Sequence, residues 1–468
     1  MKDVIMLISL LSSILMSCAG KSNSLNDSKT LFSGKEGEVR LIILDPGHFH
    51  ASLLQKNSMK QVSDTMYVYA PNSSIGLDQY LSAIKSFNQR LDNPTKWKEI
   101  VYTGDDFMDK MVSDRLGNVV ILAGNNKNKS KNIAAAIDAG INVLSDKPMA
   151  INKHDFKKLE EAYNNAEVNN VLLYDIMTER YDMLNIIERE LINNQSFFGE
   201  LEKGTSDNPA VYMESVHHFY KEVSGAPLIR PAWYYDVEQQ GEGIADVTTH
   251  LIDLLFWKCF PIAAIDYKQD IKEITASHWP TSISLQQFIK STGELSFPDY
   301  LQKYIENSTL QVYSNGCINF DVKGHKVGLK VEWNFQAPDA SSDTFMSKIE
   351  GTRAILKTVQ DKEQGFTKQL YVIKPEKVNA DDFLHNLKAT IDNIQIKYPF
   401  VTVSPTSKEH EFLIDIPIEK RDAHESHFKY VAESFFSYLV TQDIPEWEIS
   451  NTLAKYYITT QAVEIANE

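Results

Sequence analysis

Short apolar runs alternate with amphipathic segments through the first part of the chain. The runs over residues 39–44, 65–71 and 118–124 are apolar and end in turn-forming residues, which predicts buried strands. The segment after the third run has helical periodicity and stops at Gly140, a residue type that commonly ends helices. Repeated strand–helix units predict a parallel sheet with helices on both faces, and we expect this α/β domain over residues 38–150.

The later part of the chain has a different pattern. Apolar and polar residues alternate over residues 309–335, and Asn315-Gly316 and Lys323-Gly324 are typical of hairpin turns. We therefore expect residues 151–468 to form a second domain of α+β type, built on a mostly antiparallel open sheet.

The start of the chain predicts export. The apolar run over residues 4–16 is shorter than the ~20 residues that a membrane-spanning helix needs, so residues 1–18 predict a signal peptide. The sequence ending in Cys18 resembles the lipobox of bacterial lipoproteins, in which the cysteine is acylated. Cys18 is then the lipidation site and residues 19–37 are a flexible tether. We expect an exported protein attached to the bacterial membrane only through this lipid and facing the periplasm. An ordinary signal or an uncleaved anchor is the alternative.

Composition narrows the classes of function. The 468-residue chain is too long for one compact core, and its 43% hydrophobic content argues against disorder. A net charge of −16 argues against nucleic-acid binding through a basic surface. Once Cys18 carries lipid, Cys259 and Cys317 remain, and they form one disulfide or stay as two thiols.

One apolar helix contains three ionisable residues. Between Gly243 and Trp257, the spacing of Asp246, His250 and Asp253 places all three on one face, about one turn apart. Burying two carboxylates without partners costs several kcal/mol. Either these acids pair with cations, or this face lines a cleft.

The turn after the first strand is a candidate cofactor site. Asp45, Gly47 and His50 stand where a dinucleotide-binding turn has three glycines. Gly47 keeps the central position, where the backbone approaches a pyrophosphate, and His50 at a helix start favours phosphate. Asp45 is a poor neighbour for phosphate, and the second strand ends without the acid expected for a ribose hydroxyl. Taken alone, the turn leaves a plain strand–helix connection open.

Several motifs together resemble the glucose–fructose oxidoreductase/inositol dehydrogenase (Gfo/Idh/MocA) family. Asp146-Lys147-Pro148 stands where that family has Glu-Lys-Pro, a departure of one methylene. Phe198-Gly199-Glu200-Leu201 is similar to its entry into the second domain, and Gly241-Glu242-Gly243 with Asp246 and His250 is similar to its Gly, Asp, His pattern. The resemblance covers about residues 39–256 and implies a Rossmann-type domain followed by an open-sheet domain. The segments SVHHFYK and GAPLIRPAWYYD look more narrowly like a bacterial lipoprotein subgroup with its own C-terminal domain.

The resemblance implies roles for individual residues. Lys147 lies beside the nicotinamide of NAD or NADP and hydrogen-bonds the substrate hydroxyl. His250 is the general base, and Asp246 orients it or holds a substrate hydroxyl. The expected cofactor-binding residues, which include the turn and the end of the fourth strand, are Asp45, Gly47, His48, His50, Ala123, Asn125 and Lys147.

Other residues are candidates for substrate or metal binding. His218, Lys221, Arg230 and Trp233 offer the aromatic faces and donors that suit a sugar. His48, His50, His217 and His218 lack metal-site spacing, so we expect no metal. By family analogy alone, an exposed sheet face makes a homodimer possible.

The sequence favours an NAD(P)-dependent oxidoreductase acting on a sugar, a polyol or a carbohydrate-derived substrate. Two alternatives stay open. One is a glycosidase that uses bound NAD for transient oxidation and elimination, which suits an exported protein because free NAD is scarce outside the cytoplasm. The other is a non-catalytic carbohydrate-binding lipoprotein whose nucleotide site has decayed.

Overall fold

The computed structural model describes residues 32–468 apart from residues 73, 224–225 and 339–341. Cys18, the expected signal peptide and most of the expected tether therefore lie outside the described residues. Within the part that is described, no helix combines the length and the hydropathy that crossing a bilayer requires.

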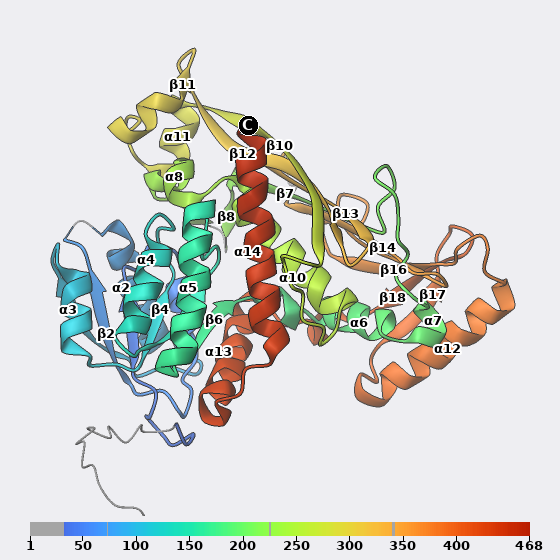
Figure 1. Cartoon of the computed structure of the whole chain (residues 1–468), viewed down its shortest axis with the longest axis horizontal. Helices are drawn as coiled ribbons and strands as arrows, with labels where there is room; N and C mark the ends of the chain where they lie inside the picture. The colour runs from blue at the N-terminus through green and yellow to red at the C-terminus, as the bar shows by residue number, and fades with distance from the viewer. Residues whose placement is uncertain (1–31, 73, 224–225, 339–341) are drawn as a thin grey trace, which may run out of the picture.

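The first domain is built on a six-stranded sheet whose neighbouring strands are all parallel, in the order β3-β2-β1-β4-β5-β6 (Figure 1). The order reverses between β1 and β4, and in such sheets ligands bind at the carboxyl ends of the strands near this point. The predicted Rossmann-type sheet is thus confirmed. Its strands are β1 (Leu41–Leu44), β2 (Thr65–Ala70), β3 (Lys98–Thr103), β4 (Val119–Leu122), β5 (Asn142–Asp146) and β6 (Leu173–Ile176), and its helices are α1 (His50–Leu53), α2 (Ile75–Gln89), α3 (Phe107–Asp114), α4 (Lys129–Asp138) and α5 (Lys153–Asn169).

The parallel sheet continues past residue 150, where we expected the first domain to end. Strand β6 pairs with β5 in parallel, with Leu173 opposite Val143. Two adjacent parallel strands need a long crossover, and α5 supplies it. The first sheet therefore ends at Ile176.

The second domain contains a ten-stranded sheet in the order β10-β12-β13-β7-β14-β15-β16-β18-β17, with β11 beside β12. Neighbours are antiparallel except β13 and β7, which are parallel. The predicted mostly antiparallel sheet is confirmed. Its strands are β7 (Val211–Tyr220), β10 (Ile271–Ser284), β11 (Ile305–Glu306), β12 (Thr309–Val322), β13 (His325–Gln336), β14 (Thr344–Glu350), β15 (Ile355–Gln360), β16 (Gln369–Ile373), β17 (Thr402–Pro405) and β18 (Glu411–Asp415), and β8 (Glu222–Val223) pairs separately with β9 (Ala226–Pro227).

The hairpin expected at Asn315-Gly316 does not exist, because β12 runs straight through it. Gly316 lets α9 (Gly243–Asp246) approach the sheet, since a Cβ there would lie 2.4 Å from Ile244 Cγ2. The Asn315 side chain donates to the carbonyl of Trp279 across the sheet. Of the two expected hairpin turns, the one at Lys323-Gly324 is present and joins β12 to β13.

Helices of the second half return to the first domain. In Figure 1 the red helix α14 (Glu446–Ala466) stands between the two sheets, and it contacts α5, α10 and β10. Helix α13 (His424–Thr441) contributes apolar side chains to the same core cluster as β1 and β2. The remaining helices are η1 (Glu179–Tyr181), α6 (Met183–Ile192), α7 (Gln195–Phe198), η2 (Ala232–Tyr235), α8 (Val237–Gln240), α10 (Thr248–Cys259), α11 (Leu285–Thr292), η3 (Asp299–Tyr304), α12 (Ala380–Lys397) and η4 (Ile418–Lys420).

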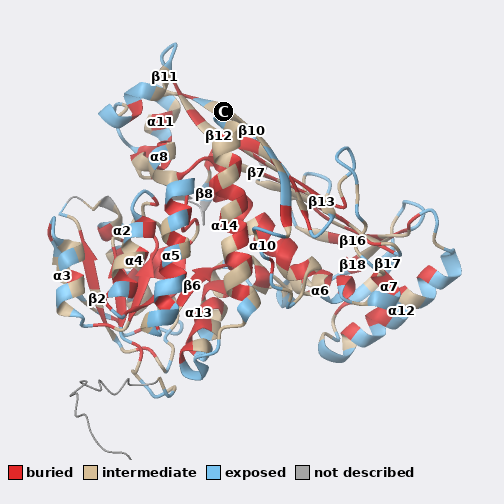
Figure 2. Cartoon of the chain, viewed as in Figure 1, coloured by how far each residue is buried: buried red, intermediate tan, exposed pale blue. Residues whose placement is uncertain are grey.

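Burial is greatest where the two domains meet. Figure 2 shows buried residues along the central strands, α10 and α14, whereas the outer faces of α3 and α12 are exposed. Cys259 and Cys317 are free thiols. The interface between the domains is thus a continuous packed region that can hold side chains in fixed positions.

Candidate active site

An ion pair joins the two domains at the carboxyl end of the parallel sheet. Lys147 directly follows β5, and its ammonium contacts the carboxylate of Asp246 at the end of α9. Both side chains are largely buried, at 13% and 7% exposure. The burial of Asp246 would raise its pKa, but Lys147 outweighs this effect, so the pKa is lowered and the carboxylate stays charged.

His250 lies one turn beyond Asp246 and lines a cavity of about 420 Å³. Its Nδ1 is buried without a hydrogen-bond partner in the described residues. Burial, and then the charge of Lys147, lower the pKa of His250 to about 4, against the opposing effects of Glu179 and Asp246. The imidazole is therefore neutral near pH 7 and can accept a proton.

Asp253, the third ionisable residue of this helix face, has a structural role. Arg180 donates two hydrogen bonds to its carboxylate, at 2.6 and 2.7 Å, and Lys455 adds a third at 3.2 Å. Burial acts to raise the pKa of Asp253, but these cations lower it to about 2. Arg180 also donates to Glu448, so this network ties η1, α10 and α14 together.

The cavity beside His250 is rich in acid–base groups. Glu179 contacts Lys368 at 3.1 Å and His424 at 3.3 Å, and the ring of His427 has two buried nitrogens without partners in the described residues. The polar and charged residues that line the cavity are Glu179, Asp182, Asn185, Ser215, His217, His250, Asp343, Thr344, Gln360, Lys368, Asp422, His424 and His427.

Our sequence analysis missed most of these residues. His424 and His427 lie three positions apart, so they share one face of α13, and that spacing is the signal that the sequence offered. Glu179 and Lys368 stand outside any recognisable motif, and only the tertiary fold brings them together.

The predicted substrate-binding residues separate into two places. His218 and Lys221 both contact Asp343, which lines the cavity, at 2.9 Å. Arg230 instead donates hydrogen bonds to the backbone carbonyls of Phe219 and His218, so it stabilises the end of strand β7.

Trp233 lies against the turn after β1 rather than in the cavity. A Cβ on Gly47 would come within 3.3 Å of its ring and within 3.2 Å of Gly124 Cα. Gly47 therefore allows close packing between the turns after β1 and β4. The backbone amide of His48 donates to the carbonyl of Ala123 at 3.0 Å, which holds the same two turns together.

A second cavity, of about 700 Å³, opens at the carboxyl ends of β1, β3 and β4. Asp45 and Asn125, two predicted cofactor-binding residues, line it. Burial raises the pKa of Asp45. The cavity is also lined by Asp105 and Asp106 after β3, and by the basic residues Arg115, Lys127 and Lys131.

Helix α8 connects this second cavity to Asp246. Asn125 donates to the side chain of Gln239 at 2.8 Å, and Gln240 donates to the carboxylate of Asp246 at 3.1 Å. Asn126 donates to the backbone carbonyl of Gln240 at 2.7 Å. A ligand in the second cavity thus lies next to the residues that hold Asp246.

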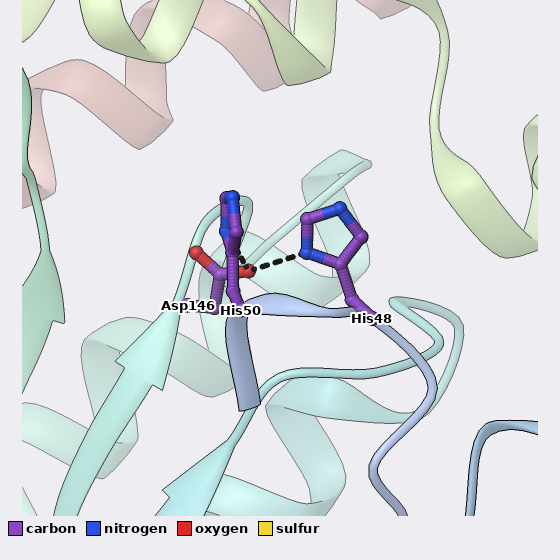
Figure 3. A group of neighbouring side chains, drawn as sticks. All are labelled: His48, His50 and Asp146. Carbon is purple, nitrogen blue, oxygen red and sulfur yellow. Dashed lines mark hydrogen bonds and ion pairs between the residues drawn. The ribbon is translucent and has the colours of Figure 1, made fainter. Parts of the chain in front are cut away.

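Three side chains of the first domain converge beside Lys147 (Figure 3). Asp146 Oδ2 lies 2.9 Å from His50 Nδ1 and 3.3 Å from His48 Nδ1. His217 does not join them, because its Nδ1 lies 3.6 Å from Asp343 Oδ2, and His218 contacts the same acid. The four histidines that we considered as metal ligands therefore form two separate pairs. His48 and His50 lie at Asp146, and His217 and His218 lie at Asp343.

Comparisons with known proteins agree with this architecture. The family model described as "Putative oxidoreductase C terminal domain" matches residues 187–467. A crystal structure of a "putative oxidoreductase" from Parabacteroides merdae is 47% identical, covers 93% of this chain and 99% of its own, and superposes with a TM-score of 0.91. The chain belongs to this oxidoreductase family. No curated protein matches it.

More distant structures share only the fold. Levoglucosan dehydrogenase, solved with NADH and levoglucosan, is 13% identical over 92% of this chain and 97% of its own, with a TM-score of 0.55. The WlbA dehydrogenase of Bordetella pertussis, solved with NADH and UDP-GlcNAcA, is 12% identical over 93% of this chain and 97% of its own, with a TM-score of 0.52. The chain thus shares its two-domain fold with these dehydrogenases.

Proposed function

We propose that this protein is an NAD(P)-dependent oxidoreductase acting on a sugar, a polyol or a carbohydrate-derived substrate. The observation that carries the proposal is the Lys147–Asp246 ion pair. It lies close to His250, which lines the first cavity, and Asp246 is linked through Gln240 and its neighbour Gln239 to Asn125, which lines the second. The cavity at the parallel sheet is the candidate site for the cofactor. The cavity beside His250, lined mostly by the second domain, is the candidate site for the substrate.

The second cavity has the size of a dinucleotide site, and its lining combines the acidic residues Asp45, Asp105, Asp106, Asp109 and Asp138 with the basic residues Arg115, Lys127 and Lys131. Its volume of about 700 Å³ is within the range of about 300–1,000 Å³ that small-molecule sites occupy. Asp105 and Asp106 supply the carboxylates for ribose hydroxyls that the end of β2 lacks, and Lys127 and Lys131 suit phosphate.

His250, Lys147 and Asp246 would have different roles in the oxidation of a substrate hydroxyl group to a carbonyl. The bound nicotinamide would accept the hydride from the carbinol carbon. His250 would take the hydroxyl proton, which its neutral state allows. Lys147 would donate a hydrogen bond to the same oxygen and stabilise the charge that develops there. Asp246 would hold the lysine in place through their ion pair.

Removing either group tests these roles. Lys147→Ala and His250→Ala should each lower turnover by about 10²–10⁴-fold in a screen of sugars and polyols read by nicotinamide absorbance. The matched control is His154→Ala, because His154 is an exposed residue of α5 that lines neither cavity. Wild-type turnover in both active-site variants would remove the assignment.

A glycosidase that oxidises its substrate transiently is the second candidate. His427 favours it, because its unpartnered ring supplies an acid–base group beyond the one that a dehydrogenase needs. Release of the aglycone from aryl glycosides, without net reduction of nucleotide, would select this candidate. Net reduction by free sugars would select the dehydrogenase.

We also propose that the protein is exported and lipid-anchored through Cys18. The support is the sequence alone, since this residue lies outside the described residues. Radiolabelled palmitate should be incorporated into the wild-type protein and lost in Cys18→Ser. Equal labelling of the two would reject the anchor.

A further inference from the structure

We propose that His48, His50 and Asp146 form a binding site for a divalent transition-metal ion of the zinc or iron(II) class. This site goes beyond the proposed function and does not depend on nucleotide binding. It is formed by the turn between β1 and α1 and by the last residue of β5.

The geometry is that of metal ligands. One possible ligand atom from each of His48, His50 and Asp146 lies within 4.8 Å of the other two. Tetrahedral bonds of about 2.0–2.2 Å to zinc place neighbouring ligand atoms about 3.3–3.6 Å apart. His48 Nδ1 lies at this separation from Asp146 Oδ2, at 3.3 Å, and His50 Nδ1, at 2.9 Å, would move outward by a few tenths of an ångström to admit the ion. Figure 3 shows both rings directed at the same carboxylate oxygen.

Hydrogen bonding alone leaves this arrangement incomplete. His50 is hydrogen-bonded to Asp146, whereas the buried Nδ1 of His48 lies 3.3 Å from the same carboxylate oxygen and, among the described residues, makes no well-directed hydrogen bond. A buried polar atom without a partner costs about 1–3 kcal/mol. An ion between the three donors would satisfy this nitrogen.

The charge of Asp146 also calls for a cation. The residue is 3% exposed, and its carboxylate contacts the two imidazoles but no Lys or Arg among the described residues. Lys129 donates to the backbone carbonyl of Asp146 instead, and Lys147 is paired with Asp246. Burying a carboxylate without a charged partner is costly, and a divalent ion would supply the charge.

The donor set indicates the class of metal. Two imidazoles and one carboxylate bind zinc or iron(II), whereas magnesium and calcium prefer sites built from oxygen. Three protein ligands leave at least one coordination position for water or for an oxygen of a bound ligand. The His48 side chain is 26% exposed, so the site is not sealed from solvent.

Metal titration of nucleotide-free protein tests the site. Protein purified without a histidine tag and stripped with a chelator should bind one Zn²⁺ per chain in a calorimetric titration. His48→Ala and Asp146→Asn should each weaken this binding by at least about tenfold. Exposed His154 again gives the matched control, and His154→Ala should bind like the wild type.

Co²⁺ loading gives a second readout, because its visible spectrum reports the coordinating atoms. A change of spectrum in His48→Ala, with an unchanged melting temperature, would identify the ring as a ligand. No specific Zn²⁺ binding by the wild type, or equal affinity and spectra in wild type and His48→Ala, would overturn the proposal. Both measurements use nucleotide-free protein, so a negative result would overturn the metal site without testing the proposed oxidoreductase activity.

Discussion

At the residue scale, the spacing of Asp246, His250 and Asp253 predicted that they share one helix face, but it did not predict which groups each of them contacts. Asp246 and His250 meet Lys147 at the site, whereas Asp253 pairs with Arg180 and Lys455 in a buried network. Sequence could show that three ionisable groups needed partners. It could not show which partners, because those lie 73 and 202 residues away from Asp253.

The buried network predicts a large cost for removing its central cation. Arg180→Met leaves Asp253 and Glu448 without this partner, and should lower the free energy of unfolding by about 3–5 kcal/mol in denaturant titrations. Lys153→Met breaks the exposed ion pair with Glu464 and should cost less than about 1 kcal/mol. Equal costs for both variants would contradict the structural role of the network.

The environment of His250 predicts an unusual pH profile. Its pKa is lowered from 6.5 to about 4 by burial and Lys147, while Glu179 and Asp246 oppose the shift and His424 adds to it. The ring stays neutral as pH falls through 6.5 and protonates only near 4. The acidic limb of kcat/KM that belongs to the general base should therefore lie near pH 4. A limb near pH 6.5 that disappears in His250→Ala would contradict this.

At the element scale, strands buried on both faces were the easiest to predict. Continuous apolar runs identified β1, β2 and β4, because parallel strands covered by helices have no polar face. The turn predicted at Asn315-Gly316 is absent, because an Asn-Gly pair occurs both in tight turns and where another backbone packs closely against a strand. Here Gly316 allows α9 to pack against β12, a tertiary contact that the local sequence does not reveal.

The packing of α9 predicts that Gly243 cannot carry a side chain. A Cβ there would lie 1.8 Å from the carbonyl oxygen of Ser314, so Gly243→Ala must displace the helix that ends at Asp246. Turnover should fall together with the melting temperature. Gly365→Ala is the control, because its Cβ meets nothing within 4 Å and its left-handed backbone costs only about 1–2 kcal/mol. Full activity in Gly243→Ala would show that this contact does not position Asp246.

At the scale of the whole molecule, the order of domains was predictable but their interlocking was not. The change from strand–helix alternation to alternating strands located two sheets. The sequence did not show that α13 would bring His424 and His427 back to the site from the end of the chain. Such contacts between distant segments are set by packing, and here they complete the cavity beside His250.

The central claim is that the two cavities and the Lys147–His250 region hold a nicotinamide dinucleotide against a substrate. The most direct measurement is mass spectrometry of the small molecules released when the purified protein is denatured, followed by titration of emptied protein with NAD and NADP. The account predicts that NAD or NADP is released, or that one of them binds at one equivalent per chain. Absence of both release and binding would contradict it and leave a carbohydrate-binding protein with a decayed nucleotide site.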